Sequence, residues 1–326
     1  MSRGNIFAVK TLTDREYLAP GHRGCSGCGQ AVAVRMVHKA LGQRIVVACA
    51  TGCMEVISSP FPQSSWEMPW IHVAFENAAA VASGIEAGLK ALRYKGKIDN
   101  RKIKVVAMAG DGGTADIGLQ ALSGALERGH DFLYICYDNE AYMNTGVQRS
   151  SSTPYGASTM TTPAGRIQKG QATWKKNMME IVAAHHIPYA ATACPSYPMD
   201  LVEKVKKGAE TERPAYLHIL SPCPPGWGIE ADDTISLGRL AVETGAFPLY
   251  EQEEGKIRLN LDFDKLMPLE KYLKGQGRFR EIDQERRDYM QERVLEMWQD
   301  LKRKAGLREL SPSRFRKEGV KWIRTS

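Results

Sequence analysis

Residues 103–113 read IKVVAMAGDGG, a largely apolar run that ends in a glycine-rich turn with one carboxylate, Asp111. A run of this kind, without polar alternation, is typical of a strand in a parallel sheet covered by helices on both faces. Similar apolar runs recur along the chain at 44–50, 132–137, 188–193 and 216–220. Helical patterns lie between them at 77–92, 117–128, 175–185 and 198–210. The alternation predicts an α/β fold with a doubly wound, mostly parallel sheet.

Three regions are expected along the chain: an N-terminal arm over 1–19, an α/β domain over 20–225 and a helical C-terminal extension over 226–326. A helix in the extension carries an apolar stripe formed by Met290, Val294, Met297, Trp298 and Leu301. Such a stripe on an otherwise charged helix predicts packing on the body of the protein or on a partner. Residues 145–170 are too long for a simple connector, which favours a cofactor-covering or interface role.

The chain has 326 residues, seven cysteines and a formal net charge of +7. No stretch approaches the roughly 18 consecutive apolar residues of a membrane-spanning helix, and the first residues lack the apolar segment of a secretory signal. We therefore expect a cytoplasmic protein without membrane contact, whose cysteines are free thiols. Much of the basic excess lies beyond residue 300. Because no zinc finger or stacking aromatic module accompanies it, a solvated or subunit-docking tail is favoured over nucleic-acid binding.

Two oxygen-bearing side chains follow neighbouring apolar runs. Asp111 comes directly after the run 103–109 and its glycine, and Asn139 follows the run 132–137. Open α/β sheets bind ligands at the carboxyl ends of their strands, so both side chains are expected at one edge. The surrounding glycines let backbone N–H groups approach a phosphate, and Mg²⁺ takes oxygen ligands from side chains and phosphates. The sequence thus indicates a magnesium and diphosphate site.

Four of the seven cysteines are expected near the same edge. Cys25 and Cys28 form a C-x-x-C, Cys53 follows the first predicted strand, and Cys223 follows the last. Four thiolates suit either structural Zn²⁺ or a [4Fe–4S] cluster, and spacing alone does not distinguish them. The remaining cysteines lie in or at the end of apolar runs and are expected to be buried as small hydrophobes: Cys49, Cys136 and Cys194.

These features together resemble the pyruvate:ferredoxin oxidoreductase (pyruvate synthase) family, within the 2-oxoacid:ferredoxin oxidoreductases, and particularly its separate beta subunit. The 26 residues between Gly112 and Asn139 are similar to the spacing of the thiamine diphosphate motif. The resemblance extends over residues 20–280 and includes 50–56 (ATGCMEV), 69–80 (PWIHVAFENAAA), 110–128, 137–150, 241–251 (AVETGAFPLYE) and 276–279 (QGRF).

The resemblance implies a fold of the thiamine-diphosphate-binding type and three cofactors: thiamine diphosphate, Mg²⁺ and a [4Fe–4S] cluster. It implies that the cluster is bound by Cys25, Cys28, Cys53 and Cys223. It implies that Mg²⁺ is bound by Asp111, Asn139 and the carbonyl of Ala141. The expected neighbours of the diphosphate are Gly112, Gly113, Thr114 and Thr145.

Asn144 is the expected contact on the substrate side of the cofactor and the one catalytic candidate. Without the resemblance, Asn144 and Thr145 would be interpreted as a capped turn, which such residues favour. His22, His72 and Glu76 lie in matching segments but are treated as structural residues.

The implied activity is the coenzyme A-dependent oxidative decarboxylation of a 2-oxoacid, with pyruvate favoured, and one-electron transfer to ferredoxin, or the reverse. The implied partners are an alpha subunit that completes the active site and gamma and ferredoxin-like delta subunits or domains. No glutamate of this chain can be assigned to activating the aminopyrimidine ring, and the resemblance places that residue on the alpha subunit. Two alternatives stay open: a non-redox thiamine decarboxylase or synthase, which needs no cluster, and a zinc-stapled interaction module, which would be colourless.

Overall fold

The computed structural model describes residues 12–60, 64–308 and 310, and its centre is an eight-stranded sheet in the order β2-β1-β3-β4-β6-β5-β7-β8. The parallel strands are β1 (Ile45–Ala50), β2 (Trp70–Val73), β3 (Lys104–Gly110), β4 (Phe132–Asp138), β5 (Tyr189–Ala193) and β6 (Ala215–Leu220). The antiparallel strands are β7 (Tyr250–Glu253) and β8 (Lys256–Leu259). The predicted doubly wound, mostly parallel sheet is confirmed.

Three strands were not predicted, and all three lie toward the edges of the sheet. β2, β7 and β8 have four residues each, and each includes half-buried or exposed positions. A short, partly exposed strand lacks the continuous apolar run that identifies β3 and β4, which are buried along almost their whole length. The pattern of apolar runs therefore predicted the central strands of the sheet but not the strands toward its edges.

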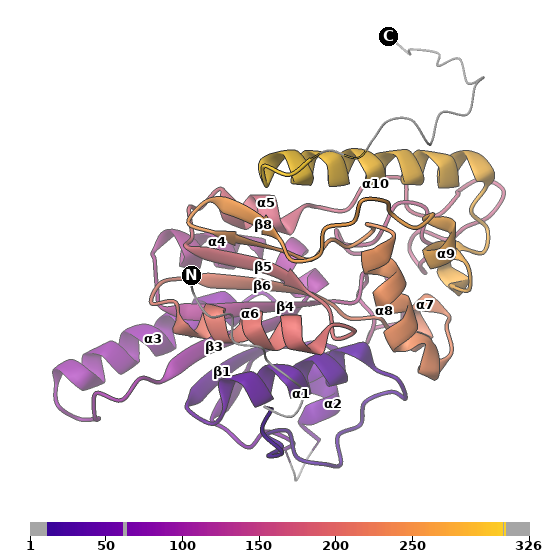
Figure 1. Cartoon of the computed structure of the whole chain (residues 1–326). Helices are drawn as coiled ribbons and strands as arrows, with labels where there is room; N and C mark the ends of the chain where they lie inside the picture. The colour runs from indigo at the N-terminus through magenta and orange to yellow at the C-terminus, as the bar shows by residue number, and fades with distance from the viewer. Residues whose placement is uncertain (1–11, 61–63, 309, 311–326) are drawn as a thin grey trace.

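Helices cover both faces of the sheet (Figure 1). α1 (Gly29–Leu41), α2 (Cys53–Ser58) and α6 (Pro198–Glu210) pack on one face. α3 (Ala78–Tyr94), α4 (Leu119–Glu127) and α5 (Met178–Ala183) pack on the other. The predicted helices 77–92, 117–128, 175–185 and 198–210 correspond to α3, α4, α5 and α6, whereas α1 and α2 were not predicted.

The C-terminal region contributes most of a third apolar cluster beside the sheet, and part of this region lies at the right of Figure 1. It comprises α7 (Pro224–Trp227), α8 (Thr234–Glu243), α9 (Glu270–Leu273) and α10 (Gln284–Lys304), with 3₁₀ turns at Ala231–Asp233 and Gly277–Phe279. The predicted packing of α10 is confirmed for Met290, Val294, Trp298 and Leu301, which are buried. Met297 is 42% exposed, so its predicted packing, on the body or on a partner, stays a prediction. The region boundary at residue 225 stays a prediction, although β7 and β8 complete the sheet from beyond it.

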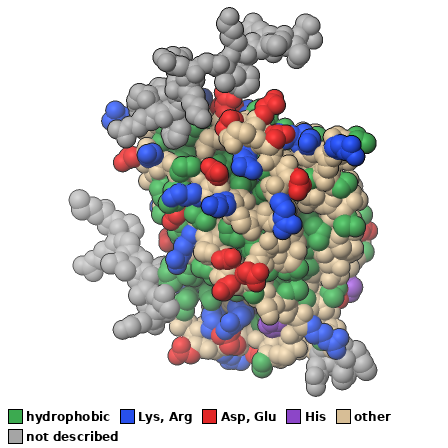
Figure 2. Space-filling view, turned by 90° about the vertical axis from the view of Figure 1, so that its right-hand side faces the viewer, with side chains coloured by type: hydrophobic (Ala, Val, Ile, Leu, Met, Phe, Trp, Pro, Cys, Tyr) green, Lys and Arg blue, Asp and Glu red, His purple; other side chains and the backbone are tan. Residues whose placement is uncertain are grey.

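The charged surface is mixed in sign. On the face shown in Figure 2, Lys and Arg side chains are interspersed with Asp and Glu. Lys302, counted with the basic tail, is 3% exposed and pairs with Asp262 at 2.7 Å, so it belongs to the packed body. The basic residues from Arg314 onward lie outside the described residues. No helix in the described ranges is both long and apolar enough to cross a membrane.

Candidate active site

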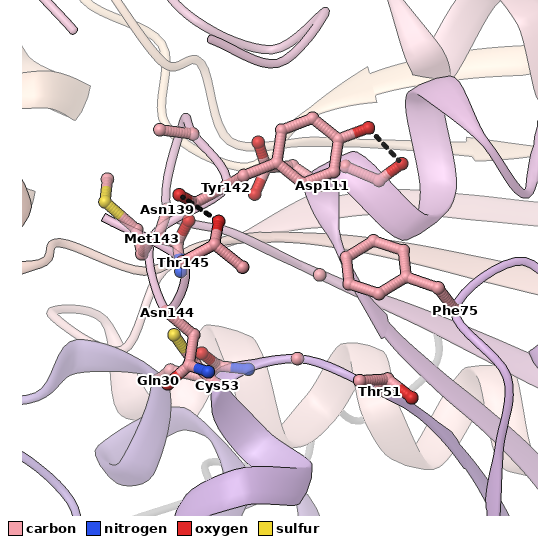
Figure 3. Close-up of a pocket in the computed structure, with 14 residues that line it drawn as sticks. Gln30, Thr51, Cys53, Phe75, Asp111, Asn139, Tyr142, Met143, Asn144 and Thr145 are labelled. Carbon is pink, nitrogen blue, oxygen red and sulfur yellow. Dashed lines mark hydrogen bonds between the residues drawn. The ribbon is translucent and has the colours of Figure 1, made fainter. Parts of the chain in front are cut away.

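The carboxyl ends of β1, β3 and β4 border one pocket (Figure 3). Its lining includes seven residues that the sequence singled out: Cys53, Asp111, Gly112, Asn139, Ala141, Asn144 and Thr145. Seven further lining residues were not predicted as site residues: Gln30, Thr51, Gly52, Phe75, Gly110, Tyr142 and Met143. Thr51 directly follows β1 and Phe75 closely follows β2, so the strand-end rule could have identified both once β2 was known. Predicted site residues from distant parts of the chain are thus brought together.

Three polar groups converge at this edge of the sheet: the Asn139 amide, the Ala141 carbonyl and the Asp111 carboxylate. The hydrogen bonds favour the amide orientation in which the Asn139 NH₂ group donates to the carbonyl oxygen of Ala141 at 2.8 Å and to Oδ1 of Asp111 at 3.0 Å. Rotating the amide by 180° would turn its oxygen toward the same two oxygen atoms. With the Asn139 oxygen turned toward the oxygens of Ala141 and Asp111, no hydrogen bond can form among the three atoms. A cation bound between them would make this arrangement favourable. Carboxylate, amide and carbonyl oxygens are the ligands that Mg²⁺ accepts, so these residues fit the ion.

Asp111 is the carboxylate of this edge that lacks a cationic partner among the described residues. It is 1% exposed and accepts a 2.5 Å hydrogen bond from the Ser150 hydroxyl. Burial and the negative charge of Asp138 raise the pKa of Asp111 well above its usual value. Burial acts in the same direction on Asp138, but the hydrogen bond from His218 at 2.8 Å and the charge of Lys175 lower its pKa. Asp111 is therefore the side chain that an added cation would stabilise most.

Gly112 begins a π-helical turn, Gly112–Asp116, and lies directly under the ring of Tyr142. A Cβ atom at Gly112 would come within 2.3 Å of a Tyr142 ring carbon, so the position requires glycine for packing. The Tyr142 hydroxyl donates to Asp116 at 3.1 Å and so holds the ring over the turn.

Gly113 and Thr114 lie behind the pocket lining rather than in it. The Thr114 hydroxyl donates to the carbonyl of Gly110 at 2.7 Å and contacts the Tyr134 hydroxyl at 3.1 Å. Any contact of residue 114 with a phosphate would therefore use its backbone N–H.

Asn144 and Thr145 are exposed at the tip of a turn closed by backbone hydrogen bonds between Tyr142 and Gln148. The Thr145 hydroxyl donates to the Tyr142 carbonyl at 3.4 Å and to the Gln148 side chain. Thr145 thus caps its own turn, as the interpretation without the resemblance expected. The side chain of Asn144 makes no hydrogen bond within the described ranges and extends into the pocket region (Figure 3). Asn144 is the better placed of the two to contact a bound molecule.

The four predicted cluster cysteines differ from the other three in exposure. Cys25 is exposed, and Cys28, Cys53 and Cys223 are half-buried. Burial and the nearby thiols of Cys223, Cys28 and Cys25 raise the pKa of Cys53 to about 12, so the four groups interact electrostatically. The remaining cysteines are buried, as expected: Cys49, Cys136 and Cys194.

Tight backbone packing brings the C-x-x-C turn against the segment that carries Cys223. The N–H of Gly29 donates to the carbonyl of Pro222 at 3.1 Å, and a Cβ atom at Gly27 would come within 2.1 Å of the Ala231 carbonyl oxygen. Within the described residues, however, no three His, Cys, Asp or Glu side chains form a set that could hold a metal ion. The cluster assignment therefore stays a prediction.

The two histidines set aside in the sequence have structural contacts. Nδ1 of His22 accepts a 3.2 Å hydrogen bond from the N–H of Gly24. Nε2 of His72 lies 2.7 Å from the hydroxyl of Thr51, one of the pocket residues. Glu76 is half-buried and is not part of the lining.

Residues 47–219 match the family of the thiamine pyrophosphate enzyme C-terminal binding domain. The chain is 57% identical over 291 residues to pyruvate synthase subunit PorB of Methanothermobacter thermautotrophicus, covering 89% of this chain and 99% of that protein. It is 48% identical over 303 residues to ketoisovalerate oxidoreductase subunit VorB of Pyrococcus furiosus, covering 92% of this chain and 97% of that protein.

Among solved structures, the chain is similar to the 2-oxoglutarate:ferredoxin oxidoreductase from Magnetococcus marinus. The TM-score is 0.53 at 21% identity, and the match covers 70% of this chain and 82% of that chain. At this identity the similarity shows a shared fold, in agreement with the α/β sheet described above.

Proposed function

Because the chain belongs to the family of thiamine pyrophosphate enzymes that includes the PorB and VorB subunits, we propose that it is the thiamine diphosphate- and [4Fe–4S]-binding subunit of a pyruvate:ferredoxin oxidoreductase. The proposed reaction is the coenzyme A-dependent oxidative decarboxylation of pyruvate with electron transfer to ferredoxin, or the reverse. The observation that carries the proposal is the convergence of the Asp111 carboxylate, the Asn139 amide and the Ala141 carbonyl at the pocket.

Each of these residues has a defined part in holding the cofactor. Asp111, Asn139 and the Ala141 carbonyl would bind Mg²⁺ together with the diphosphate oxygens. The Gly112 turn borders the same pocket, and its backbone N–H groups would approach the diphosphate there, because glycine adds no side chain of its own. When bound at these residues, thiamine diphosphate would supply the nucleophilic chemistry that a 2-oxoacid requires. Asn144 would bind the substrate from the tip of its turn.

The cluster is proposed on Cys25, Cys28, Cys53 and Cys223. Cys53 supports this assignment because it lines the same pocket as Asp111 and Asn144. An iron–sulfur cluster there would lie close to the reacting atoms and could accept electrons singly, which Zn²⁺ cannot do because it has no redox chemistry.

The pocket also supports a site shared with another subunit. Asn144 and Thr145 are exposed at its rim, and Ile117, which follows the π-helical turn, is 55% exposed. We propose that an alpha subunit covers this rim and supplies the carboxylate for the aminopyrimidine ring. Gamma and ferredoxin-like delta subunits or domains would complete the electron path to ferredoxin.

The test is anaerobic turnover of the purified complex with pyruvate, 2-oxoisovalerate and an arylpyruvate, measured as carbon dioxide release and reduction of ferredoxin. We expect the highest kcat/KM with pyruvate and dependence on coenzyme A. The similarity to a ketoisovalerate oxidoreductase subunit supports 2-oxoisovalerate as the second candidate substrate. Decarboxylation without coenzyme A or an electron acceptor would instead favour a non-redox thiamine enzyme, and colourless protein would favour a zinc module.

A further inference from the structure

Glu140 lies between Asn139 and Ala141, the two residues of the proposed magnesium turn that follow β4. Its φ angle is +69°, a conformation that a residue with a side chain rarely adopts unless surrounding contacts hold it. Two of these contacts are local. The N–H of Glu140 donates to Asp138 at 2.9 Å, and its carbonyl accepts from the Thr153 hydroxyl at 2.8 Å.

The carboxylate of Glu140 is buried between two cations from other parts of the chain. Its Oε1 accepts a hydrogen bond from Lys175 at 2.8 Å. Its Oε2 lies 2.7 Å from a terminal nitrogen of Arg278, as an ion pair rather than an aligned hydrogen bond. The side chains of Glu140 and Arg278 are each 4% exposed. A carboxylate buried to this extent depends on its cations, because neither water nor salt can replace them.

Arg278 also reaches the neighbouring residue of the turn through Trp227. The guanidinium lies 3.9 Å from the centre of the Trp227 ring, and the indole N–H donates to the carbonyl of Asn139 at 2.9 Å. Arg278 is itself fixed, because its Nε donates to Gln276 at 2.9 Å and a terminal nitrogen donates to Tyr272 at 3.3 Å. One immobilised cation therefore contacts Glu140 directly and Asn139 through Trp227.

We propose that Arg278 is a positioning residue for the magnesium site: by holding Glu140 and Trp227, it sets the turn that presents the Asn139 side chain and the Ala141 carbonyl to the ion. The inference rests on the proposed function, because it assigns Mg²⁺ to these oxygens. Arg278 does not line the pocket. Its removal should therefore weaken Mg²⁺ binding without removing a ligand.

The experiment measures how much Mg²⁺ the assembled complex needs to retain thiamine diphosphate, by titrating Mg²⁺ and quantifying bound cofactor after rapid desalting. In Arg278→Met, the half-saturating Mg²⁺ concentration should rise about 10–100-fold, the usual effect of losing a partner that orients metal ligands. Arg278→Lys should recover part of this loss, since a lysine keeps the charge but not the stacking on Trp227. If Arg278→Met does not fold, Arg278→Lys and Glu140→Gln provide the same comparison.

Lys104→Met is the matched control. Lys104 is 5% exposed and pairs with Asp131, but it begins β3, whereas Asp111 follows the other end of that strand. This variant should lose thermal stability and keep the wild-type Mg²⁺ requirement. In a Glu140→Gln background, Arg278→Met should raise the Mg²⁺ requirement by a smaller factor than it does alone, because the ion pair is already lost and only the contact with Trp227 is left to remove.

An unchanged Mg²⁺ requirement in Arg278→Met and Arg278→Lys would overturn the inference. An equal increase in Lys104→Met would also overturn it, since the effect would then report general destabilisation. Cofactor retention that does not depend on Mg²⁺ in the wild-type complex would instead overturn the proposed metal site itself.

Discussion

The hydroxyl of Tyr189 in β5 donates a 2.8 Å hydrogen bond to Glu251 in β7, at the line where parallel pairing changes to antiparallel pairing. Glu251 is 2% exposed and also accepts hydrogen bonds from Lys207 and Asn260, each at 2.8 Å. A single buried carboxylate thus joins the C-terminal region to the parallel part of the sheet.

Glu251→Gln should lower the free energy of unfolding by about 2 kcal/mol at pH 7, because hydrogen bonds to a charged group become weaker ones. Burial by itself raises the pKa of Glu251, but four donors together lower it to about 2: Lys207, Asn260, Arg258 and Tyr189. A carboxylate whose pKa is lowered by folding stabilises the protein above its unfolded pKa, and this stabilisation is lost as the pH falls toward the folded pKa. In urea unfolding followed by circular dichroism, the difference in free energy of unfolding between wild type and variant should decrease as the pH falls below about 4.5. A difference that stays constant down to pH 3 would show that the charge of Glu251 is not its source.

Replacing any one of the cluster cysteines by alanine should reduce the iron content from about four atoms per chain toward zero and abolish electron transfer. The variants are Cys25→Ala, Cys28→Ala, Cys53→Ala and Cys223→Ala. Iron analysis and visible absorbance of anaerobically purified complex provide the measurement. Cys136→Ala is the control, because Cys136 is buried within β4 and its loss should leave the iron content intact. Full iron in Cys223→Ala would refute the assignment.

Asp111→Asn should have opposite effects on the cofactor-free and cofactor-bound proteins. The buried carboxylate of Asp111 is repelled by Asp138 and has no cationic partner among the described residues, so its pKa is raised and its charge costs stability at neutral pH. Without cofactor, the variant should be more stable by about 1 kcal/mol. With Mg²⁺ and thiamine diphosphate, its affinity should fall about 100-fold, because a charged metal ligand is lost. Thermal unfolding measures the expected gain in stability of the cofactor-free variant, and calorimetry measures the expected loss of cofactor affinity. An unchanged affinity for the cofactor would disprove the site.

Asn139→Ala should weaken cofactor binding as well, because it removes the side-chain oxygen that we propose as one of the Mg²⁺ ligands. A loss of about 10–100-fold in Mg²⁺ affinity is expected. Ser150→Ala provides a comparison, since it removes a hydrogen bond to Asp111 and leaves all three proposed Mg²⁺ ligands in place. Calorimetric titration of both variants should rank Asn139→Ala as the more damaging, and the reverse order would contradict the assignment.

Gly112→Ala should destabilise the protein by about 1–3 kcal/mol, because the new methyl group would overlap the ring of Tyr142. Gly88→Ala is the control. Gly88 lies inside α3, and a Cβ atom there would meet nothing within 4 Å, so alanine should stabilise the helix by about 1 kcal/mol. Thermal unfolding of the two variants should therefore shift in opposite directions.

The sequence predicted the centre of the sheet because β1, β3, β4, β5 and β6 are buried and carry continuous apolar runs. It also placed Asp111 and Asn139 together, since strand ends meet at one edge. It did not show that the Thr114 hydroxyl forms hydrogen bonds with Gly110 and Tyr134. A threonine hydroxyl can form a hydrogen bond with the protein or with a ligand, and the sequence does not distinguish the two. Nor did it show that the QGRF segment supplies Arg278 to Glu140, since contacts between distant segments leave no periodic signal.

The order of synthesis gives the contact between Glu140 and Arg278 a consequence for maturation. The proposed magnesium turn leaves the ribosome before Lys175, and long before Arg278, so the two cations that pair with Glu140 are synthesised one after the other. A nascent chain that has completed β4 has the oxygens of the turn but not the residues that hold them. Cofactor loading should therefore follow synthesis of the segment that carries Arg278, and products truncated before this residue should not retain thiamine diphosphate.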